Sequence, residues 1–213
     1  MQVKNETRQE ILHVAEQLFE EYGYDKTTYQ MISDALGISK SMITYHFKSK
    51  PLLVNCLFEE YLDHIDHYIQ ANSPTPMNSY LYLSIQLICL YREVLSNERK
   101  KRLFFHEEIF KLWAAEKLTL VEDDLQKIVN EFNTQMTKED IHLGAVQLQG
   151  AKQGLFNEIV RNPEAISVYQ FCQTIAHMYG TYAKLDELTI LRNLSRAHEF
   201  LDSHVFPTNT HGE

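Results

Sequence analysis

The sequence predicts an all-α protein in which a small N-terminal helix-turn-helix domain precedes a larger helical domain. Apolar residues recur at three- and four-residue spacing along nearly all of the 213 residues. Only 7 Gly and 5 Pro interrupt this pattern, and the alternation that marks β-strands is scarce. A chain of this length buries a substantial core.

The cysteines and the hydropathy of the chain predict its compartment. Cys56, Cys89 and Cys172 are far apart, odd in number and set in apolar helical patterns, as is typical of reduced, buried thiols, and we expect no disulfide. Residues 1–10 lack an apolar signal segment, and the most hydrophobic stretch, residues 81–91, is too short to span a bilayer. We therefore expect a cytoplasmic protein with no membrane partner.

The net charge of -9 argues at first against a nucleic-acid partner, because phosphate contacts need lysine and arginine. The charge is unevenly distributed, however. Residues 1–50 carry six Lys or Arg and seven Asp or Glu, whereas the rest of the chain carries 14 and 22. Residues 38–50 contain Lys40, Lys48 and Lys50 and no acidic residue. A local basic edge on an acidic chain is still able to dock on DNA.

The first helix is predicted from an apolar stripe, with Glu16 among the residues of the opposite face. The stripe contains Ile11, Leu12, Ala15, Leu18, Phe19 and Tyr22. Thr7 and Glu10 have capping-box spacing at the expected start, and Gly23 is a suitable stop.

A second short helix is predicted after Thr27, which again has capping-box spacing to Gln30. Its inward face is expected to contain Ile32, Ala35 and Leu36, and Gly37 is expected to end it.

A third short helix is predicted from Lys40 to His46, with Ser39 as its N-cap and with Ile43 and Phe47 facing inward. Two short helices joined by a tight glycine turn and backed by a longer one are typical of a helix-turn-helix. The third helix is about 10 Å long at roughly 1.5 Å per residue, so it fits a major groove that is about 12 Å wide.

The motifs of this segment occur in a characteristic order. They are Gly23-Tyr24, Thr27-Thr28, Ile32-Ser33, Gly37-Ile38-Ser39, Tyr45-His46-Phe47 and Lys50. In this order and spacing, residues 7–60 resemble the TetR family of bacterial transcriptional regulators. Ser33 stands where the family usually has Ala, and Thr44 stands where an aromatic residue is common. Because of Thr44, the DNA sequence that family members bind is harder to carry over to this chain.

The resemblance implies a DNA-binding domain at residues 1–50 and a helical ligand-binding and dimerisation domain at residues 51–213, with helix 51–71 linking the two. The residues expected at DNA phosphates are Thr28, Ser39, Tyr45, His46 and Lys50, with Thr27 as a further DNA-binding candidate. The residues expected at base edges are Lys40, Ser41, Met42 and Thr44. An alternative for Tyr45 and His46 is packing between the helices of this domain.

Beyond the linking helix, the polar segment 72–76 with its two prolines is the clearest break in the chain. Further helices are predicted at 78–97, 99–116, 118–134, 139–161, 165–184 and 187–203.

Small residues at four-residue spacing, Gly150 with Gly154 and Ala176 with Gly180, favour close helix approach, because glycine within a helix costs about 1 kcal/mol. In the TetR family two such helices from each subunit form the dimer interface. The interface residues expected here are Gly150, Gly154, Leu155, Phe171, Ile175, Met178, Tyr179 and Tyr182. A homodimer also follows from the short recognition helix, which reads only a half-site. The alternative is that these residues belong to the core of a single chain.

The family also encloses a small-molecule ligand among the helices of this domain. The candidate residues here are Tyr61, Ile65, Tyr82, Cys89, Phe105, His106, Phe110, Trp113, Gln149 and Gln153. The alternative is that these aromatic residues are plain core.

These observations predict a repressor that binds a palindromic DNA operator as a homodimer and is released by a small molecule. The alternatives are a helix-turn-helix regulator controlled by a protein partner, and an activator. The paired His64 and His67 are expected on the solvated surface, and His106-Glu107-Glu108 lacks the second histidine of a zinc-protease helix. We expect no enzymatic activity, no cofactor and no bound metal.

Overall fold

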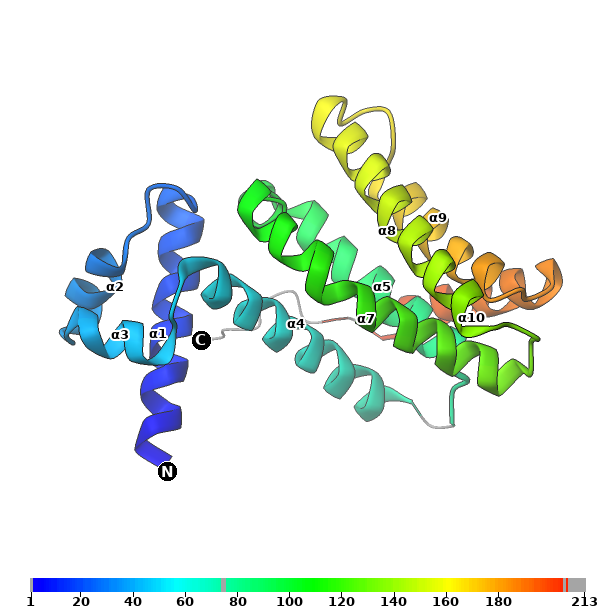
Figure 1. The fold of residues 1–213 in the computed structure, drawn as a ribbon, viewed down its shortest axis with the longest axis horizontal. Coiled ribbons are helices and arrows are strands. Elements are labelled where there is room, and N and C mark those ends of the chain that lie inside the picture. The colour runs from blue at the N-terminus through cyan, green and yellow to red at the C-terminus, as the bar shows by residue number, and fades with distance from the viewer. Residues whose placement is uncertain (1, 74–75, 205, 207–213) are drawn as a thin grey trace. The chain divides into compact units, whose positions relative to one another are not determined.

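The structure is a computed structural model that describes residues 2–73, 76–204 and 206, including their side chains except at residues 2–5, 96 and 110–117. Within these residues the backbone forms helices and no strand, which confirms the predicted all-α class (Figure 1). The helices are α1 (Gln2–Tyr22), α2 (Tyr29–Leu36), α3 (Lys40–His46), α4 (Lys50–Asn72), α5 (Ser79–Ser96), α6 (Glu98–Phe104), α7 (Glu107–Phe132), α8 (Lys138–Arg161), α9 (Val168–Tyr182) and α10 (Glu187–Ser203).

The chain divides into two compact units. The first comprises Met1–His64 and Val94–Leu112, and the second comprises Ile65–Glu93 and Trp113–Thr208. The helices α4, α5 and α7 therefore each contribute to both units. The functional boundary near residue 50, with α4 as the link between domains, remains a prediction.

In the first unit, α2 packs against both α1 and α3 (Figure 1). The core contains residues from each of these helices, among them Ile11, Phe19, Ile32 and Ile43. This small core is the one that the apolar stripes predicted.

The helix α1 differs from its prediction at its start and on its surface. It begins at Gln2, so the spacing of Thr7 and Glu10 does not mark its N-terminus. Tyr22, which was predicted to be in the core, is 45% exposed. Glu16, which was predicted to face outward, is buried and accepts a hydrogen bond from the Tyr61 hydroxyl (2.5 Å). A buried carboxylate needs such a partner, and periodicity within α1 gives no sign of it because Tyr61 is in α4.

The predicted helix break near residue 117 is wrong, because the break lies at residues 105 and 106 and α7 continues to Phe132. The Asn97 side chain caps α6 by accepting hydrogen bonds from the backbone N–H groups of Arg99 and Lys100 (2.9 and 3.2 Å). Glu107 and Glu108 occupy the first turn of α7, where negative charge interacts favourably with the helix dipole. This acidic pair is the sequence signal for the helix start.

In the second unit, α9 packs against both α8 and α10 (Figure 1). A Cβ atom at Gly180 would lie 2.7 Å from Cγ1 of Ile190 and 2.8 Å from the Tyr80 hydroxyl oxygen. The Tyr80 hydroxyl donates to the Ala176 carbonyl (2.9 Å). The small residues Ala176 and Gly180 therefore allow close packing within one chain, rather than between two chains.

Candidate nucleic-acid interface

The turn between α2 and α3 is fixed by local hydrogen bonds. The Thr28 hydroxyl caps α2 by accepting from the Met31 N–H (3.3 Å). Gly37 ends α2 with a φ of +64°, a left-handed conformation that glycine adopts without strain. Ser33 is buried, and its hydroxyl donates to the Ile38 carbonyl (2.6 Å). The N-cap of α2 is thus Thr28, whereas the capping-box spacing suggested Thr27. On the inward face of α2, Ser33 is buried, and Ala35, which was expected there, is exposed.

The helix α3 has the bounds and the inward residues that were predicted for it. The Ser39 side chain accepts a hydrogen bond from the Met42 N–H (3.3 Å), while Ile43 and Phe47 are buried. The exposed residues of the helix are Lys40, Ser41, Met42, Thr44 and Tyr45, and His46 is half-buried. A helix with one buried seam and one polar face is what a major groove requires.

Tyr45 is 63% exposed, so the alternative that it packs between helices is wrong. Its ring and that of His46 meet edge to face, with centroids 5.2 Å apart. The two side chains therefore lie together at the C-terminal end of α3, next to the exposed Lys48. Lys48 is a further phosphate candidate that the sequence prediction omitted, although its charge and position were visible.

Thr27 is fully buried, unlike the other DNA-binding candidates. Its hydroxyl lies 3.0 Å from the Leu18 carbonyl oxygen and 2.8 Å from that of Gly23, to which it donates. These contacts tie the α1–α2 turn to the end of α1. The side chain of Thr27 is therefore part of the internal support of the domain and does not belong to its DNA-facing surface.

Lys50, the first residue of α4, is half-buried and also supports the α1–α2 turn. Its ammonium group donates to the carbonyl oxygens of Tyr24 (2.7 Å) and Thr27 (3.2 Å) and lies 4.1 Å from the centroid of the Tyr24 ring. Desolvation lowers the pKa of Lys50, against the opposing effect of Asp25 and Glu108. An ammonium group has three N–H donors, so the two carbonyls leave one donor for a phosphate.

His106, which was predicted to line the ligand pocket, contacts the α1–α2 turn. Its ring lies 4.3 Å from that of Tyr24, and its Nε2 atom lies 3.1 Å from an Asp25 carboxylate oxygen. The Tyr24 hydroxyl donates to Glu108 (2.9 Å), and burial followed by this hydrogen bond raises the Tyr24 pKa. The start of α7 thus holds the turn that precedes α2.

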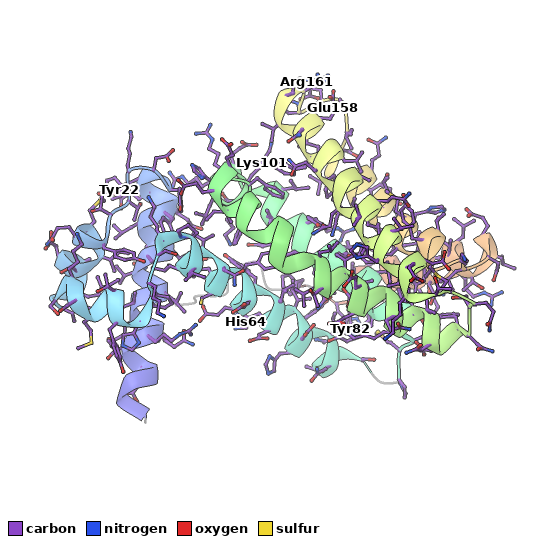
Figure 2. All side chains as sticks on the ribbon, viewed as in Figure 1. Tyr22, His64, Tyr82, Lys101, Glu158 and Arg161 are labelled. Atoms are coloured by element: carbon purple, nitrogen blue, oxygen red, sulfur yellow. The ribbon has the colours of Figure 1, made fainter. Side chains whose placement is uncertain are left out.

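The other predicted pocket residues are divided between the two units. Tyr61 and Phe105 belong to the first unit with His106, whereas Ile65, Tyr82, Cys89, Gln149 and Gln153 belong to the second. Tyr82 donates to Asp66 (2.9 Å; Figure 2). The side chains of Phe110 and Trp113 lie outside the described residues. The pocket remains a prediction.

Three residues predicted for the dimer interface are core residues of the second unit. Phe171, Ile175 and Tyr179 are at most 2% exposed within one chain. Their apolar character is therefore explained by the core of a single chain, which was the alternative to a dimer interface. Leu155, Met178 and Tyr182 are half-buried. Gly150 and Gly154 are exposed, and a Cβ atom added at either would meet nothing within 4 Å.

Sequence reasoning missed Leu143 and Val146, which are 59% and 46% exposed. Together with Gly150 and Gly154 they follow three- and four-residue spacing on one side of α8, which we call the α8 outer face. Figure 2 shows Glu158 and Arg161, an ion pair, at the C-terminal end of the same helix. The sequence did contain a sign of this face, because Leu143 and Val146 are apolar although they lie between positions that the helix buries.

Sequence reasoning also missed Lys152, a half-buried residue of α8. Its ammonium group donates to the hydroxyl of Tyr179 (3.4 Å). A lysine in the middle of an otherwise apolar helix face was the signal that pointed to it.

The described residues contain no helix that is both long and apolar enough to cross a membrane.

Comparison with known proteins agrees with this geometry. The family model described as bacterial regulatory proteins of the tetR family matches residues 11–55. The HTH-type transcriptional repressor Rv1474c of Mycobacterium tuberculosis is 42% identical over 53 residues, which are 25% of this chain and 28% of that protein. The HTH-type transcriptional repressor KstR2 of Rhodococcus jostii is 26% identical over 153 residues, covering 72% of this chain and 69% of that protein. The first match thus spans less than a third of its relative.

The similarity in fold to solved structures extends beyond residues 11–55. The structure of RolR in complex with its ligand resorcinol aligns with a TM-score of 0.61 and 14% identity, covering 92% of this chain and 96% of that chain. Both relatives in the preceding comparison are named as repressors rather than as enzymes. Residues 11–55 therefore match the tetR family of bacterial regulatory proteins in sequence, and the helix-turn-helix geometry of the first unit agrees with this match.

Proposed function

We propose that this chain is a transcriptional repressor that binds a palindromic operator as a homodimer and is released from it by a small molecule. The observation that carries the proposal is α3: it is capped at Ser39, held by two buried residues, Ile43 and Phe47, and exposed along its polar side. This geometry presents donors, acceptors and an apolar Met42 to base edges.

The proposed DNA-binding surface contains two groups of residues. Those for base edges are Lys40, Ser41, Met42 and Thr44. Those for phosphates are Thr28, Ser39, Tyr45, His46, Lys48 and Lys50. Phosphate contacts position the domain, whereas base contacts give specificity.

The α8 outer face supports the dimer. It is apolar at Leu143 and Val146 and lacks side chains at Gly150 and Gly154, so a helix of a second chain has room to approach closely. A helix of seven residues reads a half-site, and a two-fold axis doubles the site that is read.

Release by a ligand is supported by the shared fold with RolR, which was solved with a small molecule bound. A ligand shifts a protein between two states only by its different affinities for them. We therefore expect the ligand to bind the body of the repressor and to favour a state in which the two α3 helices no longer match the spacing of the half-sites.

The assembly and release steps are testable on the purified full chain. Sedimentation at micromolar concentration is expected to give a dimer, and DNA selected from a random library is expected to bind one dimer per duplex. A compound library is then screened for release of this DNA. A monomer under these conditions, or binding of one chain per duplex, would contradict the proposal.

A further inference from the structure

The helix α3 lacks most of the side chains that read single bases strongly. Its sequence from Lys40 to His46 is KSMITYH, with no arginine, asparagine or glutamine. Arginine and lysine make the specific contacts to guanine, and asparagine and glutamine make those to adenine. Lys40 therefore suits one guanine, and the rest of the half-site has to be recognised in another way.

The aliphatic hydroxyl groups of this segment are largely engaged within the protein. The Thr44 hydroxyl donates to the Ser41 carbonyl (3.0 Å). The hydroxyl oxygens of Ser39 and Ser41 are 2.8 Å apart, so one of these groups donates to the other. A hydroxyl group has only one proton to donate. Thr44 therefore offers DNA an acceptor and a methyl group, and the two serines together keep one proton.

Met42 and Thr44 present apolar groups on the two flanks of α3. Met42 is 43% exposed and Thr44 is exposed, whereas Ile43 between them is fully buried. Side chains two residues apart in an α-helix are about 200° apart around its axis. The thioether of Met42 and the methyl group of Thr44 thus lie on opposite sides of the buried seam, so they reach different base pairs.

Thymine is the one base that presents a methyl group in the major groove, and apolar side-chain groups recognise it by contact. An unbranched thioether adapts its shape to such a small apolar target. The exposed groups of α3 therefore match thymine better than they match any other base.

We propose that α3 recognises each half-site through the C5-methyl groups of two thymines, one packed against Met42 and the other against the methyl group of Thr44. This inference rests on the proposed function and names the feature of the DNA that gives specificity. Each thymine methyl group buried on binding is worth about fourfold in affinity. The two-fold axis repeats each contact, so loss of one kind of contact weakens binding by roughly tenfold or more.

The test begins with duplexes that the full chain selects from a random DNA library. The most enriched duplex is made in a second form with deoxyuridine in place of every thymidine, which removes only the C5-methyl groups and keeps the pairing with adenine. Fluorescence anisotropy at one salt concentration is expected to show at least tenfold weaker binding to the uracil form. Replacement of one thymine at a time, in both half-sites together, is expected to trace this loss to two positions.

Two substitutions at Thr44 separate its methyl group from its hydroxyl group. Thr44→Ser removes the methyl group and is expected to abolish the preference for thymine over uracil at one of the two positions. Thr44→Val keeps a methyl group and removes the hydroxyl, so the preference is expected to persist there. Met42→Gln, which keeps a similar length, is expected to abolish the preference at the other position. The matched control is Leu120→Gln, at a 45% exposed residue of α7, which is expected to keep both preferences.

Equal affinity of the unaltered chain for the two forms of the duplex would overturn the inference and leave the proposed function standing. So would a thymine preference that persists at both positions in Thr44→Ser or in Met42→Gln, or one that Thr44→Val abolishes. If the library yields no enriched duplex at all, the proposed function fails, and this inference fails with it.

Discussion

Two half-buried lysines, Lys50 and Lys152, differ in what compensates their charge. Lys50 donates to two backbone carbonyls and lies over the Tyr24 ring, so its surroundings stabilise the ammonium group. Lys152 has one phenol and no described ion pair. Lys50 is recognisable in the sequence because it belongs to a motif. Lys152 is recognisable only as a lysine within an apolar helix face, and the structure adds that this face of α8 is buried.

Replacement of Lys50 by Ala is expected to weaken binding to all DNA sequences alike and to reduce the slope of log K against log salt by about one unit. The reason is loss of one phosphate contact, which carries no sequence information. The measurement is a fluorescence anisotropy titration at several salt concentrations, with Lys127→Ala, an exposed lysine of α7, as the control. An unchanged slope together with a lower melting temperature would restrict Lys50 to its role in holding the α1–α2 turn.

Replacement of Lys152 by Met is expected to stabilise the ligand-free chain by about 1–3 kcal/mol at pH 7, because an incompletely compensated charge is replaced by an apolar side chain. The folded-state pKa, about 8, is below the ordinary value of 10.5. Between these values the unfolded chain binds more protons, so the stability contributed by this residue rises with pH.

Denaturant unfolding of both proteins from pH 7 to pH 10 checks this expectation. The advantage of the Met variant is expected to shrink as the pH rises through 8. An advantage that stays constant, or a variant that is less stable throughout, would show that the ammonium group is well compensated in the folded chain.

Among the elements, the N-cap of α3 and the glycine that ends α2 were predicted correctly, whereas the N-caps of α1 and α2 and the distant packing were not. Ser39, Gly37 and the bounds of α3 follow from local chemistry that acts within a few residues. The break between α6 and α7 was misplaced, because apolar periodicity runs through it and the true signal is the acidic pair that follows His106. Glu16 is buried against Tyr61 of α4, so the residues around Glu16 in the sequence of α1 do not indicate its burial.

Two substitutions at Ser39 separate its capping role from its DNA contact. Ser39→Ala is expected to cost about 1 kcal/mol of stability, because the Met42 N–H loses its acceptor. Ser39→Asp keeps a good cap and so keeps stability, but it places a negative charge where a phosphate is expected and is predicted to lose most of its DNA affinity. Thermal unfolding and DNA titration check the pair. Normal DNA binding by Ser39→Asp would remove Ser39 from the phosphate contacts.

Two glycines in the C-terminal helices are expected to respond in opposite ways to alanine. Gly180→Ala brings a methyl group within 3 Å of Tyr80 and Ile190, and such overpacking costs about 1–3 kcal/mol. Gly154→Ala meets no atom of its own chain, so helix propensity is expected to stabilise the folded monomer by up to about 1 kcal/mol, while the added methyl group is expected to weaken the proposed dimer at the α8 outer face. Urea unfolding of both variants tests this contrast. Equal effects would mean that the close packing around Gly180 is relieved by a small shift of its neighbours.

At the scale of the whole molecule, the resemblance to the TetR family could be found from the sequence because the DNA-binding motifs are contiguous, and the family model matches residues 11–55. The dimer and pocket residues were harder to predict. Phe171 and Tyr179 are apolar or aromatic at helical spacing, which does not distinguish a monomer core from an interface, and the structure places them in the core. The pocket candidates were drawn from both units because composition alone does not show which helices pack together.

We expect two copies of α3 to read the two halves of a palindrome. Selection of bound duplexes from a random DNA library by the full-length chain tests it most directly. We expect enrichment of one palindrome whose half-sites are about one helical turn or a multiple of it apart. With Thr44→Ala, we expect a change of base preference at the same position of both half-sites. Failure to enrich a palindrome, or a Thr44→Ala variant that changes only one half-site, would contradict it.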